Sequence, residues 1–245
     1  MTPDTRILSV ANLGTVEYRA ALALQTAMVA ARQADEIGDT LLLLEHPHVF
    51  TLGRGADERF LLSRRPGDIP VYRVSRGGQV TYHGPGQLIG YPILKLEGRD
   101  RDVHRYLRSL EDAMIRALAD HEIEAARREG LTGIWVGTRE IGLRKIGSIG
   151  VGIKRWTTCH GFALNVCPDL SYFSGIVPCG IDGCEMTSIE VLSHQKIGVD
   201  EFAATMRSRF AEVFGYQDSV TVEPSALWKL VAFNSTTLEE QDRNA

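Results

Sequence analysis

The sequence is poor in cysteine and in long apolar runs. Four cysteines in 245 residues, none of them in a C-x-x-C pair, are too few for a disulfide scaffold and lack the ligand spacing of structural zinc. The longest uninterrupted apolar runs, Ala20–Leu24 and Ala27–Ala31, are five residues long, against roughly 20 needed to cross a bilayer. We therefore expect reduced thiols, no metal site and no membrane span.

The chain also lacks a large excess of charge of either sign. It has 27 Lys and Arg against 31 Asp and Glu, a net charge of −4, with 44% hydrophobic residues. This balance argues against a basic nucleic-acid-binding protein and against a disordered acidic segment. The first residues resemble neither a signal peptide nor a transit peptide, so a cytoplasmic protein is expected.

No linker-like stretch or internal repeat divides the chain. We predict one catalytic domain over residues 1–222 and a polar, partly disordered C-terminal extension over residues 223–245.

Apolar periodicity predicts an α+β fold. Three segments have helical character: 17–34, 103–118 and 202–213. Short β-type runs lie between them, several separated by only a tight turn, so a mixed and largely antiparallel sheet with packed helices is expected. The predicted strands are Thr40–Leu44, Val49–Leu52, Val71–Val74, Gln79–Tyr82, Leu88–Leu94, Thr132–Val136, Ile146–Ile153, Thr157–Val166 and Thr187–Leu192.

Glycine is concentrated in two regions. Eight of the 24 glycines fall between Gly53 and Gly90, and eleven fall between Gly130 and Gly183. Such clustering indicates backbone shaped for close approach or for positive φ. The first region contains Arg76-Gly-Gly-Gln-Val-Thr-Tyr-His83-Gly-Pro-Gly86, which is interpreted as a pocket wall or, equally well, as a hairpin with glycine turns and a hydrogen-bonded histidine.

Lys145 and Cys179 are the candidate reactive pair of the second region. Lys145 begins an apolar, glycine-bearing strand and is expected to be partly buried, where an ammonium needs a counter-charge or a lowered pKa. Cys179 lies between Pro178 and Gly180 on a constrained turn, and a nearby ammonium favours the nucleophilic thiolate. The alternatives are a lysine that reaches solvent at a strand end and a cysteine that is simply a small buried apolar residue.

Several common catalytic motifs are missing. The glycine-rich segments match neither the dinucleotide-binding G-x-G-x-x-G pattern nor the Walker pattern. The chain has no G-x-S-x-G elbow and no H-E-x-x-H helix. The sequence therefore gives little reason to predict a serine hydrolase or a zinc protease.

Taken together, six segments resemble the lipoyl(octanoyl) transferases, a family of octanoyl-[acyl carrier protein]:protein N-octanoyltransferases. The resemblance covers residues 40–192 in the family order. The matching segments are Glu45–Gly53, Arg76–Leu88, Arg144–Ile146, Ser148–Val151, His160–Val166 and Ile176–Ile181.

The resemblance implies a biotin/lipoate protein ligase-like domain that transfers octanoyl groups in protein lipoylation. The donor would be octanoyl-acyl carrier protein, and the acceptors would be lipoyl domains of 2-oxoacid dehydrogenase complexes and the glycine cleavage H protein. No cofactor is implied. Cys179 would carry the acyl thioester, and Lys145 would tune that thiol or move protons. The acyl pocket would be lined by Arg76, Gly77, Gly78, Gln79, Val80, Thr81, Tyr82, His83, Ser148, Ile149, Gly150, Gly161, Phe162 and Ala163.

Three departures from the family pattern carry expectations of their own. Gly147, where a larger residue is common, would widen the acyl channel. Cys184, five residues beyond Cys179, is a second candidate thiol. The tail after about Val222 also differs.

Two other functions remain open. An ATP-dependent lipoate or biotin ligase would need nucleotide recognition and no catalytic cysteine. A non-catalytic acyl-binding protein would form no thioester.

Arginines are concentrated just before the first glycine motif. Six arginines stand against three acids from Arg54 to Arg76, a local excess of 6 − 3 = +3. We expect Arg59, Arg64 and Arg65 to dock an acidic carrier protein beside the channel. The alternative is a solvated arginine-bearing loop without a partner.

Overall fold

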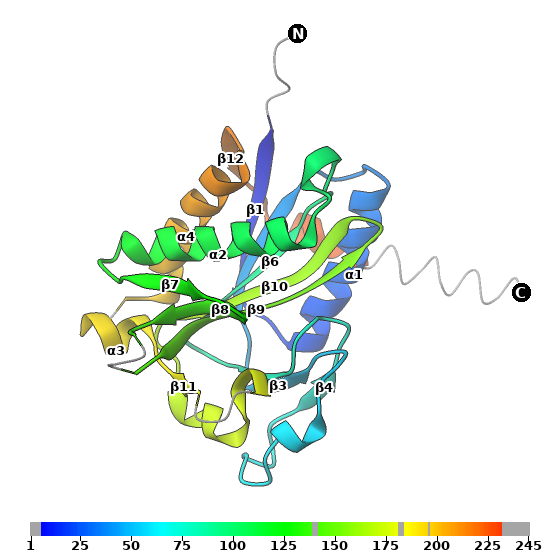
Figure 1. Ribbon diagram of the computed structural model, residues 1–245. Coiled ribbons are helices and arrows are strands. Elements are labelled where there is room, and N and C mark those ends of the chain that lie inside the picture. Colours follow the sequence, from blue (N-terminus) through cyan, green and yellow to red (C-terminus); the bar gives the residue numbers. More distant parts are fainter. Residues whose placement is uncertain (1–5, 139–141, 181–183, 196, 232–245) are drawn as a thin grey trace, which may run out of the picture.

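The computed structural model describes residues 6–138, 142–180, 184–195 and 197–231. A long mixed sheet runs through the centre of the molecule in the order β12-β1-β2-β6-β10-β9-β8-β7, and β11 pairs with β9 (Figure 1). Its strands are β1 (Ile7–Thr15), β2 (Thr40–Glu45), β6 (Gln87–Ile93), β7 (Ala125–Arg128), β8 (Leu131–Val136), β9 (Arg144–Lys154), β10 (Thr157–Asn165), β11 (Glu185–Met186) and β12 (Asp218–Thr221).

Pairing within this sheet is mostly antiparallel. The pairs from β2 through β6, β10, β9 and β8 to β7 are antiparallel, whereas β12–β1, β1–β2 and β11–β9 are parallel. A second sheet has the order β4-β3-β5 and consists of β3 (Val49–Leu52), β4 (Val71–Arg73) and β5 (Val80–His83). The predicted α+β fold with a mixed, largely antiparallel sheet is confirmed.

The centre of the main sheet is covered on both faces. Along β2, Leu41 and Leu43 join the apolar cluster that contains α2 and α4, while Leu42 and Leu44 join the cluster that contains α1. This alternation is the two-residue period of a strand. The helices are α1 (Tyr18–Gln33), α2 (Val103–Ala119), α3 (Ile189–Ser193) and α4 (Val199–Phe214), with short 3-10 turns η1 (Glu58–Phe60), η2 (Gly98–Asp100), η3 (Leu170–Gly175) and η4 (Pro178–Gly180).

The three long helices lie where periodicity predicts them. α2 begins after Asp102, whose side chain accepts a hydrogen bond from the Arg105 N–H over 3.1 Å and so satisfies one of the free donors of the first turn. Leu110, Met114 and Leu118 on its apolar stripe are fully buried. α2 and α4 pack side by side, so they cover one face of the sheet together.

One predicted strand is wrong, and four strands were not predicted. The segment Thr187–Leu192 is not a strand, because Ser188 caps the helix α3 by accepting a hydrogen bond from the Val191 N–H. The unpredicted strands are β1, β7, β12 and the two-residue β11. β7 and β12 are short and polar, and each lies at one end of the sheet. Neither strand has a buried face, so apolar and polar residues do not alternate in their sequences.

The described part of the C-terminal extension packs on the domain. Residues 224–231 are helical, and Leu227 is buried against the cluster that contains α1. Residues 232–245 lie outside the described part of the chain, so the predicted disorder of the extension stays a prediction there.

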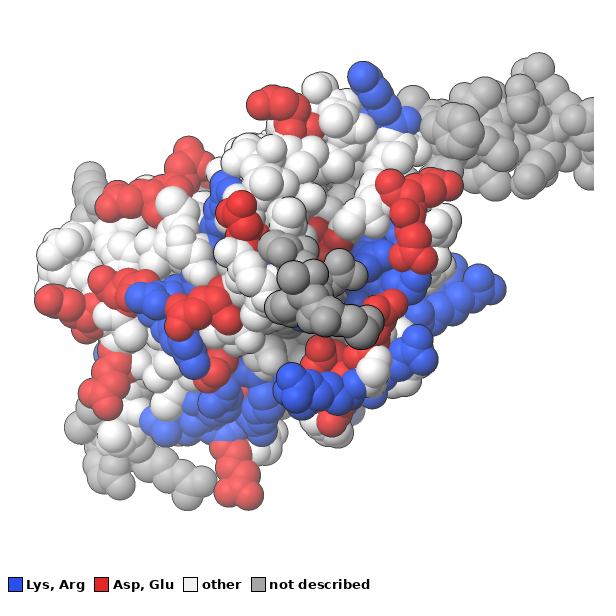
Figure 2. Space-filling view, turned by 90° about the horizontal axis from the view of Figure 1, so that it is seen from above, with Lys and Arg blue, Asp and Glu red and all other residues white. Residues whose placement is uncertain are grey.

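Charges on the surface are mixed. In Figure 2 basic and acidic side chains alternate over the face seen from above. Ion pairs join α2 and α4, for example between Arg116 and Glu212 at 2.7 Å and between Arg209 and Asp120 at 2.6 Å. Among the described residues, no helix is long and apolar enough to span a bilayer.

Candidate active site

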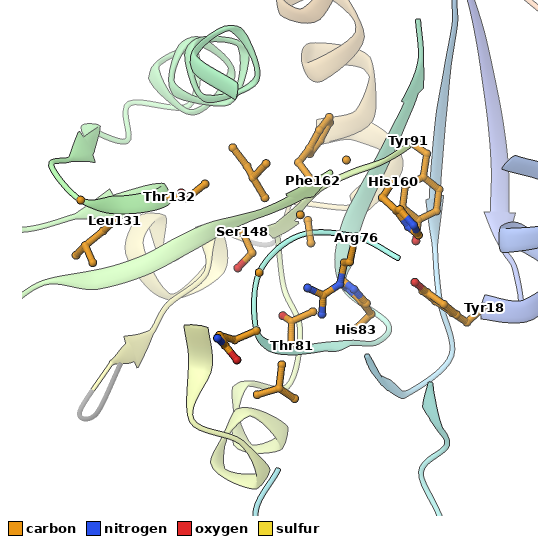
Figure 3. A pocket seen from close by; sticks show the side chains of 18 residues that line it. Tyr18, Arg76, Thr81, His83, Tyr91, Leu131, Thr132, Ser148, His160 and Phe162 are labelled. Atoms are coloured by element: carbon orange, nitrogen blue, oxygen red, sulfur yellow. The ribbon is translucent and has the colours of Figure 1, made fainter. Parts of the chain in front are cut away.

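A cavity of about 370 Å³ opens between β9, β10 and the loop that carries the Arg76 motif (Figure 3). The residues predicted to form the acyl pocket line this cavity, with the exception of Gly77 and Tyr82. The lining predicted residues are Arg76, Gly78, Gln79, Val80, Thr81, His83, Ser148, Ile149, Gly150, Gly161, Phe162 and Ala163.

Glycines let the Arg76 loop lie directly against β9. The Gly77 N–H donates to the Val151 carbonyl over 2.9 Å. A Cβ at Gly150 would come within 3.0 Å of Arg76 Cδ and 3.1 Å of the Gly77 carbonyl, and a Cβ at Gly53 would lie 2.1 Å from the Gly78 carbonyl. The first glycine region therefore provides close approach of backbone segments, as its composition predicts.

The Arg76 guanidinium is a buried cation in the cavity wall. Its Nε and both terminal nitrogens donate to the Thr51 hydroxyl, the Thr51 carbonyl and the Gly77 carbonyl at 2.7 to 3.2 Å. These three neutral oxygens hold the charged group in a fixed position. Arg76 therefore contributes positive potential to the cavity.

Two histidines in the wall are neutral because of this charge and because they are buried. Burial, the neighbouring His46 and the Arg76 charge hold the pKa of His83 well below its usual value. Burial and Arg76 lower the pKa of His160 to about 4. His83 Nδ1 lies 3.2 Å from Gln87 Oε1, whose amide nitrogen donates to the Tyr82 carbonyl, so the His83 Nδ1 is the protonated nitrogen.

Tyr18, Tyr91 and His160 close one end of the cavity, and Leu131 and Thr132 lie toward the other (Figure 3). None of these five is among the predicted site residues. Tyr18 and Tyr91 come from α1 and β6, 73 positions apart, so nothing local in the sequence indicates that they meet. His160 does carry a signal, because it begins the His-Gly-Phe-Ala-Leu-Asn segment of the second glycine region.

Lys145 lies behind the Thr132 end of the cavity and is almost fully buried, with a relative exposure of 1%. Its Nζ donates to the Thr132 carbonyl over 2.9 Å and lies 5.0 Å from the centre of the Trp135 ring. A carbonyl and an aromatic face both stabilise a buried ammonium. The alternative of a lysine that reaches solvent is wrong.

A bulge in β9 sets the position of Lys145. Gly147 faces Ile134 of β8 and Lys145 faces the next residue, Trp135, so Ile146 is an extra residue in β9. Beyond Gly147, where pairing with β10 ends, β11 takes the place beside β9, and Met186 pairs with Lys145. Bulges re-aim side chains at this kind of position.

The turn that contains Cys179 precedes β11 by a few residues and lies beside β5. Val177 N–H donates to the Phe60 carbonyl over 2.8 Å, and Gly180 N–H donates to the Val177 carbonyl over 3.0 Å. Gly180 has φ of +69°, and a Cβ there would also meet the Phe60 ring at 2.8 Å. The turn is therefore constrained as its sequence predicts, while the Cys179 side chain lies outside the described part of the structure.

The other cysteines differ in environment. Burial raises the pKa of the Cys159 thiol, and burial with nearby Glu190 and Glu45 raises that of Cys167, so both resist forming thiolates. Cys184 is half-buried and directly precedes Glu185, which pairs with Arg144. Cys184 thus remains close in the fold to Lys145.

Three residues expected to shape the cavity do not line it. A Cβ at Gly147 would meet Ile134 and Leu164 of the main core at 3.2 Å, so the expectation that Gly147 widens the channel is wrong. Tyr82 is buried in the small sheet, and its hydroxyl lies 2.7 Å from His48 Nδ1. Gly77 contributes backbone contacts alone, its N–H to β9 and its carbonyl to the Arg76 guanidinium.

The described residues contain no cluster of three or more His, Cys, Asp or Glu side chains that could hold a metal ion.

Curated proteins named octanoyltransferase match most of the chain. One from Rhodospirillum rubrum is 50% identical over 82% of this chain and 91% of its own length. Others from Solibacter usitatus and Syntrophotalea carbinolica are 48% and 47% identical, covering 84% and 83% of this chain and 92% of each relative.

Solved structures show the same fold at low sequence identity. A lipoate protein ligase from Thermoplasma acidophilum with bound lipoic acid has a TM-score of 0.67 at 16% identity and covers 93% of both chains. A lipoate-protein ligase A bound with ATP has a TM-score of 0.65 at 16% identity, covering 93% of this chain and 92% of that chain.

The predicted ligase-like fold is thus confirmed. The family described as lipoyl protein ligase A/B catalytic domain matches residues 17–211. Together with the octanoyltransferase relatives, this match shows that the chain belongs to that family and groups with its octanoyltransferases.

Proposed function

We propose that this acyltransferase moves an octanoyl group from octanoyl-acyl carrier protein to a lysine of a lipoyl domain through a thioester on Cys179. The observation that carries the proposal is the position of Lys145. It is buried in β9, beside the strand that follows the Cys179 turn, and its Nζ is bonded to a residue of the cavity wall. A fixed ammonium favours the thiolate form of a nearby thiol, and Cys179 is that thiol in our proposal.

In the first step the Cys179 thiolate attacks the carbonyl carbon of the carrier thioester. The new carbon–sulfur bond forms as the bond to the carrier sulfur breaks, and the carrier leaves as a thiol after taking a proton. In the second step the acceptor lysine amine attacks the enzyme thioester, a carbon–nitrogen bond forms, and the thiolate of Cys179 leaves. In this scheme Lys145 gives a proton to the carrier sulfur in the first step and takes one from the attacking amine in the second, and no nucleotide is consumed.

The cavity is the proposed site of the octanoyl chain. Its Thr132 end adjoins Lys145, and its far end is closed by Tyr18 and Tyr91 (Figure 3). We place the thioester carbon at the first end and the terminal methyl at the second. Phe162 and Ile149 supply apolar surface along this path.

The acceptors in this proposal are lipoyl domains, those of 2-oxoacid dehydrogenase complexes and the glycine cleavage H protein. An ATP-dependent ligase is the main rival, because a lipoate-protein ligase A bound with ATP has the same fold. Such an enzyme would activate a free acid and would need no cysteine.

Intact-mass spectrometry after mixing the protein with octanoyl-acyl carrier protein tests the proposal. An octanoyl adduct should form without ATP or Mg²⁺, map to the peptide that contains Cys179, and disappear on addition of a lipoyl domain. Cys179→Ser should form no adduct, while the matched variant Cys184→Ser should form it at the parent rate. Adduct on Cys184, or transfer that requires ATP and free octanoate, would contradict the proposal.

A further inference from the structure

A single peptide group joins a buried carboxylate to Lys145. The carbonyl of the Thr132–Gly133 peptide accepts the hydrogen bond from Lys145 Nζ at 2.9 Å. The N–H of that same peptide, on Gly133, donates to Glu111 Oε1 at 3.2 Å. The peptide therefore has an ammonium on its oxygen and a carboxylate on its nitrogen.

Glu111 is an unusual residue for the face of α2 that packs on the sheet. Its relative exposure is 1%, whereas the arginines that pair with it reach solvent. Arg108 and Arg127 both bond the other carboxylate oxygen, Oε2, at 2.7 and 3.1 Å. The outer oxygen thus balances the charge, and the inner oxygen is directed at the Gly133 N–H.

The backbone of Gly133 is shaped for this arrangement. Its φ of +110° is open only to glycine, and a Cβ there would lie 2.5 Å from the Gly147 carbonyl and 2.9 Å from Lys145 Cε. Glycine therefore lets the lysine side chain pass directly over the peptide whose carbonyl it bonds. The bulge at Ile146 on β9 lies opposite the two residues that follow Gly133, Ile134 and Trp135.

We propose that Glu111 is a positioning residue for acyl transfer, acting on Lys145 through the Thr132–Gly133 peptide. Hydrogen bonds in a chain polarise one another, and a bond with a charged partner is roughly twice as strong as a neutral one. The carboxylate on the N–H makes the carbonyl a stronger acceptor and fixes the Lys145 ammonium behind the thioester end of the cavity. Glu111 itself does not line that cavity.

This inference rests on the proposed role of Lys145 and makes it more specific. Both chemical steps need the Lys145 nitrogen at one place, so loosening it slows acylation and transfer alike. Binding of the octanoyl chain uses the cavity wall and does not involve Glu111. Loss of the Glu111 carboxylate should therefore lower kcat and leave KM for the octanoyl carrier unchanged.

Glu111→Gln tests this positioning role, with Asp112→Asn as the matched control. Asp112 is the next residue of α2 and shares the partner Arg127, at 2.6 Å, but makes no hydrogen bond to Gly133 in the part of the chain that the structure describes. Glu111→Gln keeps an acceptor for the Gly133 N–H and removes the charge. We expect kcat and the single-turnover acylation rate to fall about tenfold with KM unchanged, and Asp112→Asn to behave like the parent.

The outcomes separate this inference from the proposed function. Parent kcat in Glu111→Gln, with acylation lost in Lys145→Ala, overturns the role of Glu111 and leaves the role of Lys145 intact. Acylation retained in Lys145→Ala overturns both. Equal losses in Glu111→Gln and Asp112→Asn also overturn it, because they trace the effect to the arginine pairs.

A third variant keeps the test decisive if Glu111→Gln does not fold. Glu111→Asp retains the charge and withdraws it by one methylene group from the Gly133 N–H. A folded Glu111→Asp protein should show the same loss in kcat at unchanged KM, and parent kcat in that variant overturns the inference.

Discussion

The Tyr91 hydroxyl donates a hydrogen bond to His46 Nε2 over 2.7 Å. The donor is identified by the other ring nitrogen, because His46 Nδ1 lies 2.6 Å from the Val16 carbonyl, which can only accept. His46 is therefore a neutral imidazole with its proton on Nδ1. Burial lowers its pKa to about 4, and the bond holds the Tyr91 ring at the far end of the cavity.

Stability should fall in mildly acidic solution because His46 must stay neutral. Below pH 6.5 the unfolded chain binds a proton at this residue, while the folded protein does so only near pH 4. Folding stability is thus complete above about pH 6.5 and is lost as the pH falls toward 4. Between pH 7.5 and 5.5, His46 should contribute about 1 kcal/mol to this loss.

Urea unfolding at the two pH values measures this contribution. In His46→Gln the free energy of unfolding should drop about 1 kcal/mol less between pH 7.5 and 5.5 than in the parent. Substitution of the exposed His104 by Gln is the control and should follow the parent. If the free energy of unfolding of His46→Gln fell as much as that of the parent between the two pH values, protonation of His46 would not be a cause of the loss.

Removing the buried ammonium should slow acylation without unfolding the protein. Lys145→Ala leaves Thr132 and Trp135 without their cation, and in the proposed mechanism the Cys179 thiolate would lose its charged partner. We expect alkylation of Cys179 by iodoacetamide at pH 7 to slow at least about tenfold, equivalent to about 1.4 kcal/mol. Near-parent thermal unfolding would show that the fold is intact, and an unchanged alkylation rate would confine Lys145 to proton transfer.

The length of the acyl chain should depend on Tyr18. Its ring is buried at the closed end of the cavity and stacks on Tyr72 at 5.7 Å. Tyr18→Leu removes the outer part of that ring, so kcat/KM should shift from eight-carbon toward ten- and twelve-carbon thioesters, by roughly tenfold per extra pair of methylene groups accommodated.

Tyr72→Leu is the matched control for the chain-length prediction. Tyr72 contacts the same ring but does not line the cavity, so its variant should keep the parent preference. If both variants kept the parent profile, the chain would end elsewhere than at Tyr18.

The sequence predicted the elements whose burial is regular. Leu41 to Leu44 form a short continuous apolar run buried on both faces, and the stripe of α2 repeats with the helical period, so both elements could be identified from the sequence. The polar edge strands β7 and β12 carry no such signal. The composition of the segment after Thr187 is typical of a strand, but Ser188 caps a helix there.

The candidate site was predictable where it depends on short motifs. Glycine clustering indicated the Arg76 loop and β9, which do face each other. Tyr18, Tyr91 and Glu111 were not predictable, because each acts through a contact with a residue distant in the chain. In the sequence, Glu111 also looks like a surface residue of a helix, because Arg108 three positions earlier is an ordinary ion-pair partner.

Docking of the acidic carrier should depend on Arg64 more than on the other arginines of its loop. Arg59 is paired with Asp57 and Arg73 with Glu58, both at 2.6 Å, and Arg65 is half-buried. Arg64 is exposed, and its Nε donates at 2.6 Å to the carbonyl of Ser174 in η3, the turn that precedes the Cys179 turn. Its charge therefore lies on the surface beside η3, which precedes the Cys179 turn in the chain.

Arg64→Glu should lower kcat/KM for octanoyl-acyl carrier protein by about three- to tenfold at low salt and leave transfer from a small octanoyl thioester unchanged, since rim charges act mainly on encounter. The difference should shrink near 1 M salt, where the screening length falls to about 3 Å. Arg99→Glu, at an exposed arginine that lines a different cavity, is the charge-matched control and should have little effect. Equal effects of Arg64→Glu on both donors, or a carrier reaction of the parent without salt dependence, would leave the arginine loop as a solvated surface with no role in docking.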